Sequence, residues 1–462
     1  MSAPRYFIRT YGCQMNERDS EILAGQLEQL GYRPAKDETA ADLVVVNTCA
    51  VRHSAESHAF GYIGGLKELK DQRRGLRIAV AGCMAQEPET VAWLRRHAPH
   101  VDLVFGTHNL HRLPELLERA EAAGEMVVDV WDSAGEVQEH LPSRRRAGRR
   151  AFVNVIYGCD KFCTFCIVPY TRGRERSRRP EAVLEEVRAL AAEGFSDVTL
   201  LGQNVNSYGH DLDPAADLAD LLTAAAAVPG IRWVRYLTSH PKDFSSRLIA
   251  AIAGDPRITR HLHLPVQSGS TPVLKRMNRK YTAEQYRDLV ARIRAAIPDV
   301  VLTTDIIVGF PGETEADFAA TLDLVRDLRF DAAFTFLYSA RAGTPAARWE
   351  AREPVPNPVK KARLNRLMEL QYAISLEANQ AWVGRQEVVL VEGVSRKNPG
   401  VWSARTRDNK VVLLDRDPGV ELADRFVPVR ITGARTFYLT GEVAGAPLDD
   451  PLPPRDVALP LA

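Results

Sequence analysis

The sequence predicts an α/β protein with three domains: an N-terminal parallel α/β sheet domain, a central partial (β/α)6 barrel and a small C-terminal antiparallel β-barrel. Strand and helix patterns alternate through residues 4–375, which indicates parallel sheets with helices on their faces. Residues 378–446 change to short apolar runs separated by turn residues, a pattern typical of antiparallel strands. The length of 462 residues suits about three domains.

The composition is that of an ordinary folded protein and excludes several classes. Apolar residues make up 45% of the chain and charged residues 26%, which excludes wholesale disorder, collagen-like repeats and a small disulfide scaffold. No stretch approaches the roughly 18 consecutive apolar residues of a membrane span, and the first residues lack a signal-peptide pattern. We therefore expect a cytoplasmic protein without a membrane partner and, since no coiled-coil pattern is present, a monomer.

The charge is balanced over the whole chain but not locally. The formal net charge is +1, which gives no global sign of nucleic-acid binding. Residues 141–180, however, hold eleven Lys or Arg and two acidic residues. Such a basic block is a candidate phosphate-facing patch, and a solvated basic linker is the alternative.

The N-terminal domain is expected over residues 4–120, followed by a linker over 121–144. Apolar runs predict four strands, each followed by a helical pattern. The expected strands are residues 6–12, 42–48, 76–82 and 101–106. Cys13, Cys49 and Cys83 each lie just after one of the first three strands. Ligands bind at the carboxyl edge of open parallel sheets, so these thiols are expected to share a ligand; the alternative is that each is a small buried apolar residue.

The central domain is expected over residues 145–375. Its predicted strands are residues 152–158, 197–203, 233–239, 261–266, 301–310 and 333–339. Six strand–helix units are too few for a closed eight-stranded barrel and suit an open barrel whose ligand site lies at the carboxyl ends of the strands. A long amphipathic helix at 360–380 leads to the β-rich barrel of 378–446, and the Pro-rich tail at 447–462 is expected to be disordered.

A tight group of three cysteines follows the first strand of the central domain and is the most informative motif. Cys159, Cys163 and Cys166 form a Cys-x3-Cys-x2-Cys pattern on one loop. A structural zinc site usually has four protein ligands and often pairs two Cys-x2-Cys elements, and no second pair is present. Three thiolates on a short loop suit three corners of a cubane iron–sulfur cluster. The fourth iron is then open to a substrate or cofactor. The alternative for this group of cysteines is a structural zinc site.

These motifs resemble those of a known family. A Cys-x3-Cys-x2-Cys loop after the first strand of a partial barrel is similar to the radical S-adenosylmethionine superfamily. The stretches YGCQMNERDSE, NTCAVR and AGCMAQ resemble the N-terminal domain of methylthiotransferases, and LLGQNVNSYG, LPVQSGS, MNRKYT and TDIIVGFPGETEADF resemble their central domain. The β-rich C-terminal segment resembles a TRAM domain, a small RNA-binding barrel. The resemblance covers residues 4–446, and the Gln-Met-Asn and Gly-Gln-Asn-Val-Asn stretches are similar to the tRNA-modifying MiaB branch.

The resemblance implies two [4Fe-4S] clusters, with S-adenosylmethionine as the further cofactor. The ligands of the radical-generating cluster would be Cys159, Cys163 and Cys166. The ligands of an auxiliary cluster would be Cys13, Cys49 and Cys83. One departure from the family pattern is Tyr157, where an arginine often precedes the Gly-Cys.

The resemblance also implies the reaction, which is methylthiolation of carbon 2 of N6-isopentenyladenosine next to the anticodon of a tRNA. One S-adenosylmethionine would methylate a sulfur at the auxiliary cluster, and a second would be cleaved to an adenosyl radical. Reductive cleavage needs an electron, so a flavodoxin- or ferredoxin-like donor is an implied partner besides the tRNA.

Polar residues at strand ends are candidates for contacts with S-adenosylmethionine. They lie at the end of the second predicted strand of the central domain and after the fourth, and they are Gly202, Gln203, Asn204, Gln267 and Ser268. Turn formation is the alternative for each. Asp305 is a polar residue within an apolar strand, so we expect it to point into the barrel.

Two groups of residues are expected to contact RNA. Basic residues after the cysteine loop are expected to meet anticodon-loop phosphates, and these are Arg172, Arg174, Arg176, Arg178 and Arg179. In the C-terminal barrel, Trp402 is expected to stack on a base while basic residues grip the backbone. Those basic residues are Arg396, Lys397, Arg405 and Arg407. A protein-binding role for this barrel is the alternative.

Two other functions fit parts of the pattern. A ribosomal-protein methylthiotransferase has the same clusters but usually lacks the Gln-Met-Asn and Gly-Gln-Asn-Val-Asn stretches, and it is the alternative that we retain. A metal-stabilised RNA-binding protein without catalysis does not account for six cysteines in two triads that each lack a fourth ligand.

Overall fold

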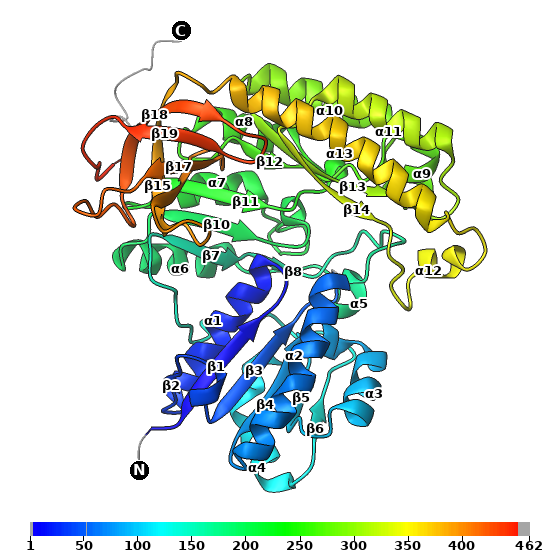
Figure 1. The fold of residues 1–462 in the computed structure, drawn as a ribbon, viewed down its shortest axis with the longest axis vertical. Coiled ribbons are helices and arrows are strands. Elements are labelled where there is room, and N and C mark those ends of the chain that lie inside the picture. The colour runs from blue at the N-terminus through cyan, green and yellow to red at the C-terminus, as the bar shows by residue number, and fades with distance from the viewer. Residues whose placement is uncertain (1–2, 52, 451–462) are drawn as a thin grey trace.

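The computed structural model describes residues 3–51 and 53–450 and consists of a parallel sheet domain, a partial barrel and a small closed barrel (Figure 1). The N-terminal sheet domain lies at one end of the molecule. The partial barrel and the small barrel form the other end, side by side. Among the described residues, no helix has the length and apolar character needed to cross a membrane.

The N-terminal sheet has six parallel strands in the order β2-β1-β3-β4-β5-β6. The strands are β1 (Arg5–Thr10), β2 (Arg33–Pro34), β3 (Leu43–Thr48), β4 (Arg77–Gly82), β5 (Leu103–Phe105) and β6 (Val127–Asp129). The helices are α1 (Gln14–Gln29), α2 (His53–Gln72), α3 (Pro88–His97) and α4 (Leu113–Ala123). Along β3, Val45 packs with α1 and α4, whereas Val44 and Val46 pack with α2 and α3, because successive side chains point to opposite faces.

Two short strands of this sheet differ from the prediction. Strands β2 and β6 have two and three residues, which is too short for a strand pattern to show in the sequence. The linker predicted over 121–144 is wrong at its start, because residues 121–123 end α4 and Val127–Asp129 pairs with β5.

The central domain is the expected open barrel of six parallel strands. The strands are β7 (Arg150–Asn154), β10 (Asp197–Leu201), β11 (Trp233–Leu237), β12 (His261–His263), β13 (Val301–Val308) and β14 (Ala332–Leu337). They form two three-stranded sheets, β11-β10-β7 and β12-β13-β14, and an isolated bridge joins Val234 of β11 to Ile258, three residues before β12. The pair β8 (Ile156–Tyr157) and β9 (Arg176–Ser177) brackets the cysteine loop.

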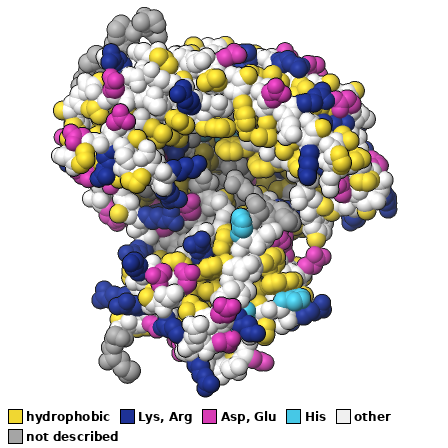
Figure 2. All heavy atoms as spheres, in the orientation of Figure 1, with side chains coloured by type: hydrophobic (Ala, Val, Ile, Leu, Met, Phe, Trp, Pro, Cys, Tyr) yellow, Lys and Arg dark blue, Asp and Glu magenta, His cyan; other side chains and the backbone are white. Residues whose placement is uncertain are grey.

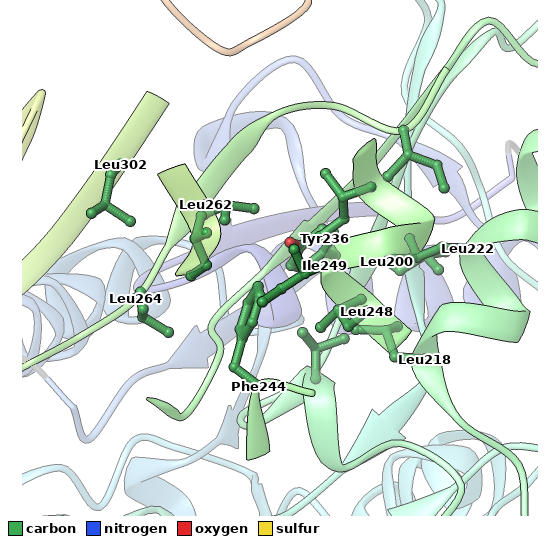
Figure 3. Packing of buried hydrophobic residues seen from close by; sticks show 14 of the residues in the cluster. Leu200, Leu218, Leu222, Tyr236, Phe244, Leu248, Ile249, Leu262, Leu264 and Leu302 are labelled. Atoms are coloured by element: carbon green, nitrogen blue, oxygen red, sulfur yellow. The ribbon is translucent and has the colours of Figure 1, made fainter. Parts of the chain in front are cut away.

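The helices of the central domain are α5 (Val168–Thr171), α6 (Pro180–Ala192), α7 (Leu218–Ala226), α8 (Ser246–Gly254), α9 (Thr271–Arg276), α10 (Ala283–Ala296), α11 (Glu315–Leu328), α12 (Pro345–Glu350) and α13 (Asn357–Gln380). Of these, α6 to α11 and α13 cover the outside of the partial barrel. Leu200, Tyr236 and Leu262 point outward from three strands into a continuous apolar core beneath these helices (Figure 3). Because successive side chains of a strand point to opposite faces, the strand residues between those of the core face the barrel interior.

A small closed barrel covers the amino ends of the central strands. Its strands are β15 (Gln386–Val394), β16 (Val401–Thr406), β17 (Val411–Asp415), β18 (Phe426–Ala434) and β19 (Leu439–Val443). All pairings are antiparallel except the parallel pair β17–β19. The Arg235 side chain of β11 donates to the carbonyl oxygens of Arg407 and Thr406 at 2.6 and 3.2 Å, and the rings of Trp233 and Phe426 lie 4.9 Å apart. These contacts leave the carboxyl ends of the strands as the open end of the partial barrel.

The tail that the sequence predicts to be disordered begins with residues that pack on this barrel. The Leu448 amide donates to the Phe426 carbonyl oxygen of the small barrel at 2.7 Å, and Asp450 pairs with Arg232, which precedes β11 of the central domain, at 3.1 Å. The prediction is therefore wrong for residues 447–450, and the remainder of it, residues 451–462, lies outside the described residues.

Buried ion pairs join the N-terminal domain to the partial barrel. Glu186 of α6 forms salt bridges with Arg18 of α1 at 3.0 Å and with Arg178 at 2.5 Å. Arg145 of the connecting segment forms a third salt bridge with it. Burial by itself would raise the pKa of Glu186, but the three guanidinium groups outweigh it and lower this pKa to about 2. One carboxylate thus balances charges from three separate segments of the chain.

We predict that Glu186→Gln lowers the stability of the cluster-free protein by about 3–5 kcal/mol at pH 7, since it leaves buried guanidinium groups without their partner. The folded pKa of about 2 lies below the unfolded value of about 4.3. The stabilisation is therefore present above about pH 4.3 and is lost as the pH falls toward 2. Thermal denaturation at pH 7 and pH 3 measures this difference, which should shrink at pH 3. Glu185→Gln, at an exposed neighbouring position, is the control, and equal losses for both variants would contradict the prediction.

Candidate cluster-binding site

The loop of the first cysteine triad follows β8 at the open end of the partial barrel. Cys163 is buried, and Cys159 and Cys166 are half-buried. Backbone hydrogen bonds hold the loop, because the Cys159 amide donates to Gly173 at 3.1 Å and the Thr164 amide donates to Met277 at 3.1 Å. The Cys166 amide donates to the Cys163 carbonyl oxygen at 2.9 Å, which holds these two cysteines in one turn.

Close backbone contact shapes the start of this loop. Gly158 has a φ of +76°, and a Cβ at this position would lie 2.0 Å from the Arg174 carbonyl oxygen. Glycine is therefore required before Cys159, because another side chain would displace the segment that follows the loop.

The second triad comes from the carboxyl ends of three neighbouring strands, as predicted. Cys13 precedes α1, Cys49 follows β3 and Cys83 follows β4. A Cβ on Gly12, whose φ is +110°, would lie 2.7 Å from the Cys49 sulfur, so the first two loops touch. The thiols of Cys49 and Cys13 both interact electrostatically with Cys83.

Asn16 ties the loops of the second triad together. Its side-chain amide donates to the carbonyl oxygens of Tyr11 and Thr48, each at 2.8 Å. Its side-chain oxygen lies 3.9 Å from the Cys83 sulfur. Asn16 is fully buried, so its hydrogen bonds fix how the three loops converge.

The two triads meet at one junction between the domains. Ile167, which directly follows Cys166, packs with Cys83 and Met84 in a single apolar cluster. Figure 1 shows α5 beside the carboxyl end of the N-terminal sheet. Figure 2 shows a hollow between the N-terminal domain and the two barrels, with Lys and Arg side chains along part of its rim.

Arg172 is the clearest correction to the sequence-based predictions. It was expected at RNA phosphates, yet it is 4% exposed and its Nε lies 3.3 Å from the Cys83 sulfur. It also pairs with Asp19 of α1 at 2.7 Å. Burial by itself would lower the pKa of Arg172, but Asp19 and the nearby thiols outweigh this effect and raise the pKa. A phosphate contact needs an exposed guanidinium, and this one is enclosed between the domains.

Arg279 stands in a similar relation to the first triad and was missed in the sequence. Its Nη1 lies 3.4 Å from the Cys163 sulfur, and its Nη2 donates to the Pro265 carbonyl oxygen at 2.6 Å. It lies in the MNRKYT stretch, 113 residues beyond Cys166. A single basic residue at that distance gives no local pattern that points to a thiol.

The donor sets of both triads fit iron–sulfur clusters in their chemistry. Burial raises the pKa of the Cys83 thiol to about 12 and that of Cys166 to about 12, so metal binding must displace their protons. Among residues 3–51 and 53–450, no three His, Cys, Asp or Glu side chains are gathered as the ligands of one metal ion. In a cubane the three ligands bind different irons.

The candidate S-adenosylmethionine contacts divide into two groups. Gln203 lies at the cysteine loop, because its side-chain oxygen accepts from the Gly158 amide at 2.6 Å and its amide contacts the Met15 sulfur. Asn204 donates to Asp243 at 2.9 Å and accepts from the His240 amide at 3.1 Å. Both residues therefore lie at the open end of the partial barrel.

The other cofactor candidates are held more tightly by the fold. A Cβ on Gly202 would lie 2.4 Å from the Ile156 side chain, and Gln267 has a φ of +73° and is 7% exposed. Ser268 is completely buried, and its hydroxyl lies 3.3 Å from that of Thr321 in α11. The cofactor prediction is wrong for Ser268, because its hydroxyl is directed to the covering helix.

Asp305 lies beside the barrel interior, as expected. Its carboxylate is 3.4 Å from Nε2 of His263 on the neighbouring strand β12. The ring of Phe334 on β14 packs against His263 at 5.9 Å and is 55% exposed.

The basic residues after the cysteine loop differ in exposure. Arg174 and Arg179 are exposed, and Arg174 lies over the Phe162 ring at 4.6 Å. Arg176 is half-buried and donates to the Gly135 carbonyl oxygen at 2.7 Å. Arg178 is buried in the ion pairs with Glu186, so its predicted phosphate contact is wrong.

The predicted RNA contacts of the small barrel also differ in their exposure. Arg396 and Lys397 are exposed in the loop between β15 and β16. Arg405 pairs with Glu392 at 2.9 Å, and Arg407 pairs with Asp408 at 3.0 Å. Trp402 is 1% exposed within the apolar core of the barrel. The prediction that Trp402 stacks on a base is therefore wrong, because its ring points from β16 into the core of the barrel.

We predict that Trp402→Ala lowers the free energy of unfolding by about 3–5 kcal/mol, as for other buried tryptophans, and leaves the salt dependence of RNA binding unchanged. Arg396→Ala and Lys397→Ala should instead keep the stability and each reduce the slope of log affinity against log salt by about one. Thermal denaturation and tRNA binding at several salt concentrations measure the two effects. A stable Trp402→Ala protein with selectively weakened RNA binding would contradict the assignment.

Comparisons with known proteins agree with this arrangement. Residues 5–106 match the Uncharacterized protein family UPF0004, residues 153–325 the Radical SAM superfamily and residues 380–444 the TRAM domain. Among solved structures, the radical S-adenosylmethionine methyltransferase TsrM from Kitasatospora setae aligns with a TM-score of 0.54 at 15% identity, covering 81% of this chain and 89% of that chain. This likeness confirms the predicted fold.

Curated relatives are similar over almost the whole chain. The tRNA-2-methylthio-N(6)-dimethylallyladenosine synthase of Acetivibrio thermocellus is 52% identical over 438 residues, which cover 95% of this chain and 90% of the relative. The enzyme of the same name from Pelotomaculum thermopropionicum is 51% identical over 438 residues, with 95% and 97% covered. The resemblance found in the sequence is confirmed, and the chain belongs to the family of tRNA-2-methylthio-N(6)-dimethylallyladenosine synthases.

Proposed function

We propose that this chain methylthiolates carbon 2 of N6-isopentenyladenosine next to the anticodon in tRNA. The observation that carries the proposal is the meeting of two cysteine triads at one junction, where Ile167 and Cys83 share one apolar cluster and Arg172 contacts the Cys83 sulfur. The curated relatives named above are tRNA-2-methylthio-N(6)-dimethylallyladenosine synthases, so the tRNA reaction is favoured over modification of a ribosomal protein.

The chemistry of the substrate accounts for the need for cofactors. The hydrogen on carbon 2 of adenine is not acidic and is not a leaving group, so a positioned acid or base has no proton to move there. When bound, the two [4Fe-4S] clusters and S-adenosylmethionine supply the radical, the sulfur and the methyl group that the reaction needs. The protein has to hold and orient them.

The residues of the first triad and its surroundings would hold the radical-generating cluster and its cofactor. Cys159, Cys163 and Cys166 are the ligands, and the Gly158 hydrogen bond to Gln203 fixes the loop against β10. Gln203 and Asn204 face the open end of the partial barrel and are our candidates for S-adenosylmethionine contacts, with Gly202 allowing close packing and Gln267 at the end of the fourth unit.

The auxiliary cluster would be held by Cys13, Cys49 and Cys83. The fully buried Asn16 holds the loops of Cys13 and Cys49 together through hydrogen bonds at 2.8 Å. A cluster in this position would lie across the domain junction from the first triad, because Cys83 shares an apolar cluster with Ile167, the residue after Cys166.

Further parts of the proposal concern the partners. The remaining candidates for contact with tRNA phosphates are Arg174, Arg176, Arg179, Arg396, Lys397 and Arg405. A flavodoxin- or ferredoxin-like protein would supply the electron, and we propose a monomer in the cytoplasm.

We predict that the anaerobically reconstituted protein holds about eight irons and that replacing all three cysteines of either triad with alanine leaves about four. Neither triple variant should form the 2-methylthio nucleoside on prenylated tRNA. Iron and sulfide quantification with mass spectrometry of digested tRNA measures both results. The two triple variants serve as controls for each other, and tRNA without the isopentenyl group serves as the substrate control. About four irons in the intact protein, or zinc in place of iron, would contradict the two-cluster mechanism.

A further inference from the structure

We propose that one buried arginine beside each cysteine triad adjusts the reduction potential of the cluster that the triad would hold. Arg172 would act on the auxiliary cluster and Arg279 on the radical-generating cluster. Both are positioning residues that act through a ligand sulfur. The inference rests on the proposed two-cluster function and adds residues that are not themselves cluster ligands.

The geometry around Arg172 is specific to a sulfur contact. Its Nε lies 3.3 Å from the Cys83 sulfur, and its Nη2 donates to the Asn16 side-chain oxygen at 2.6 Å and pairs with Asp19 at 2.7 Å. Cys83 and Asp19 are 3% and 1% exposed. A guanidinium with its N–H groups spread between a carboxylate, an amide and a thiol has a fixed orientation toward the sulfur.

Arg279 repeats this arrangement at the other triad with different partners. Its Nη1 lies 3.4 Å from the Cys163 sulfur, its Nε lies 2.9 Å from the Tyr281 hydroxyl, and its Nη2 donates to Pro265. Arg279 is 5% exposed. Arg279 has no carboxylate partner among the described residues, and its N–H groups contact the thiol and neutral oxygens.

Electrostatics gives both contacts the same direction of effect. Reduction adds one negative charge to a cluster, and a buried cation with an N–H toward a ligand sulfur stabilises the more negative state. The interaction is strong because the site excludes water and has a low local dielectric. Each arginine should therefore raise the potential of its cluster and make its reduction by the electron donor easier.

Arg172 additionally links the two domains. It follows α5 and belongs to the segment of the first triad, yet its sulfur contact is with the second triad. The environment of the auxiliary cluster is therefore complete only when the N-terminal domain is docked on the partial barrel.

The test uses full-length proteins that retain one cluster each. In the variant lacking Cys159, Cys163 and Cys166, Arg172→Gln is added. In the variant lacking Cys13, Cys49 and Cys83, Arg279→Gln is added. Redox titration followed by electron paramagnetic resonance measures the midpoint potential. We expect the ratio of reduced to oxidised cluster at a fixed potential to fall about tenfold, which corresponds to 59 mV for one electron.

Matched variants separate this effect from loss of structure. Arg178→Gln removes another buried guanidinium, six residues from Arg172, whose N–H groups contact Glu139, the Asn154 carbonyl oxygen and Glu186, and should leave the midpoint unchanged. Because Arg172→Gln leaves Asp19 charged and unpaired, the double variant Asp19→Asn/Arg172→Gln is measured beside it, with circular dichroism as the check on folding.

The possible outcomes are distinct. A lower midpoint in the Arg172→Gln and double variants, with Arg178→Gln unchanged, supports the proposal. An unchanged midpoint in clusters of normal iron content overturns it and leaves the proposed function standing. If both Arg172 variants fold but bind no iron while Arg178→Gln binds about four, the arginine serves assembly and the proposal is overturned. If the parental single-cluster proteins bind no iron, the two-cluster function fails first.

Discussion

The arrangement of the molecule depends on a buried network of charges between the N-terminal domain and the partial barrel. Glu186 forms salt bridges with Arg18, Arg145 and Arg178, and Asp19 forms one with Arg172. Such charges are costly to bury unless each one is paired. Two of these pairs, Arg18–Glu186 and Arg172–Asp19, cross between the domains, so the network stabilises the orientation in which the two sheets face each other.

That orientation brings two independent parallel sheets together at their carboxyl ends. Each sheet places cysteines in the loops that follow its strands, because parallel strands end on the same edge. The small barrel covers the amino ends of the central strands through Arg235 and Trp233. The open end of the partial barrel is thus directed to the N-terminal domain, and a reaction that needs two cofactor sites has them on either side of one junction.

Strand periodicity and cysteine spacing predicted much of this from the sequence. The six strands of the partial barrel and the placement of Cys13, Cys49 and Cys83 after strands depend on local patterns, and both are found in the structure. Short-range patterns do not show β2 and β6, whose pairing with neighbouring strands forms them. They also do not tell which basic residues are exposed, and Arg172 and Arg178 were misassigned for this reason. Trp402 was misassigned because an aromatic among basic residues resembles an RNA-binding surface even when its strand turns it inward.

The sequence by itself determined the three-part α/β architecture, the six cysteine positions and the family, because each of these is carried by residues close together in the chain. Only the tertiary structure decided what lies next to each sulfur. Arg172 reaches Cys83 from 89 residues away, and Arg279 reaches Cys163 from 116 residues away. Contacts at such separations depend on how the domains dock and on which side chains are buried together, and no local pattern of residue types encodes them.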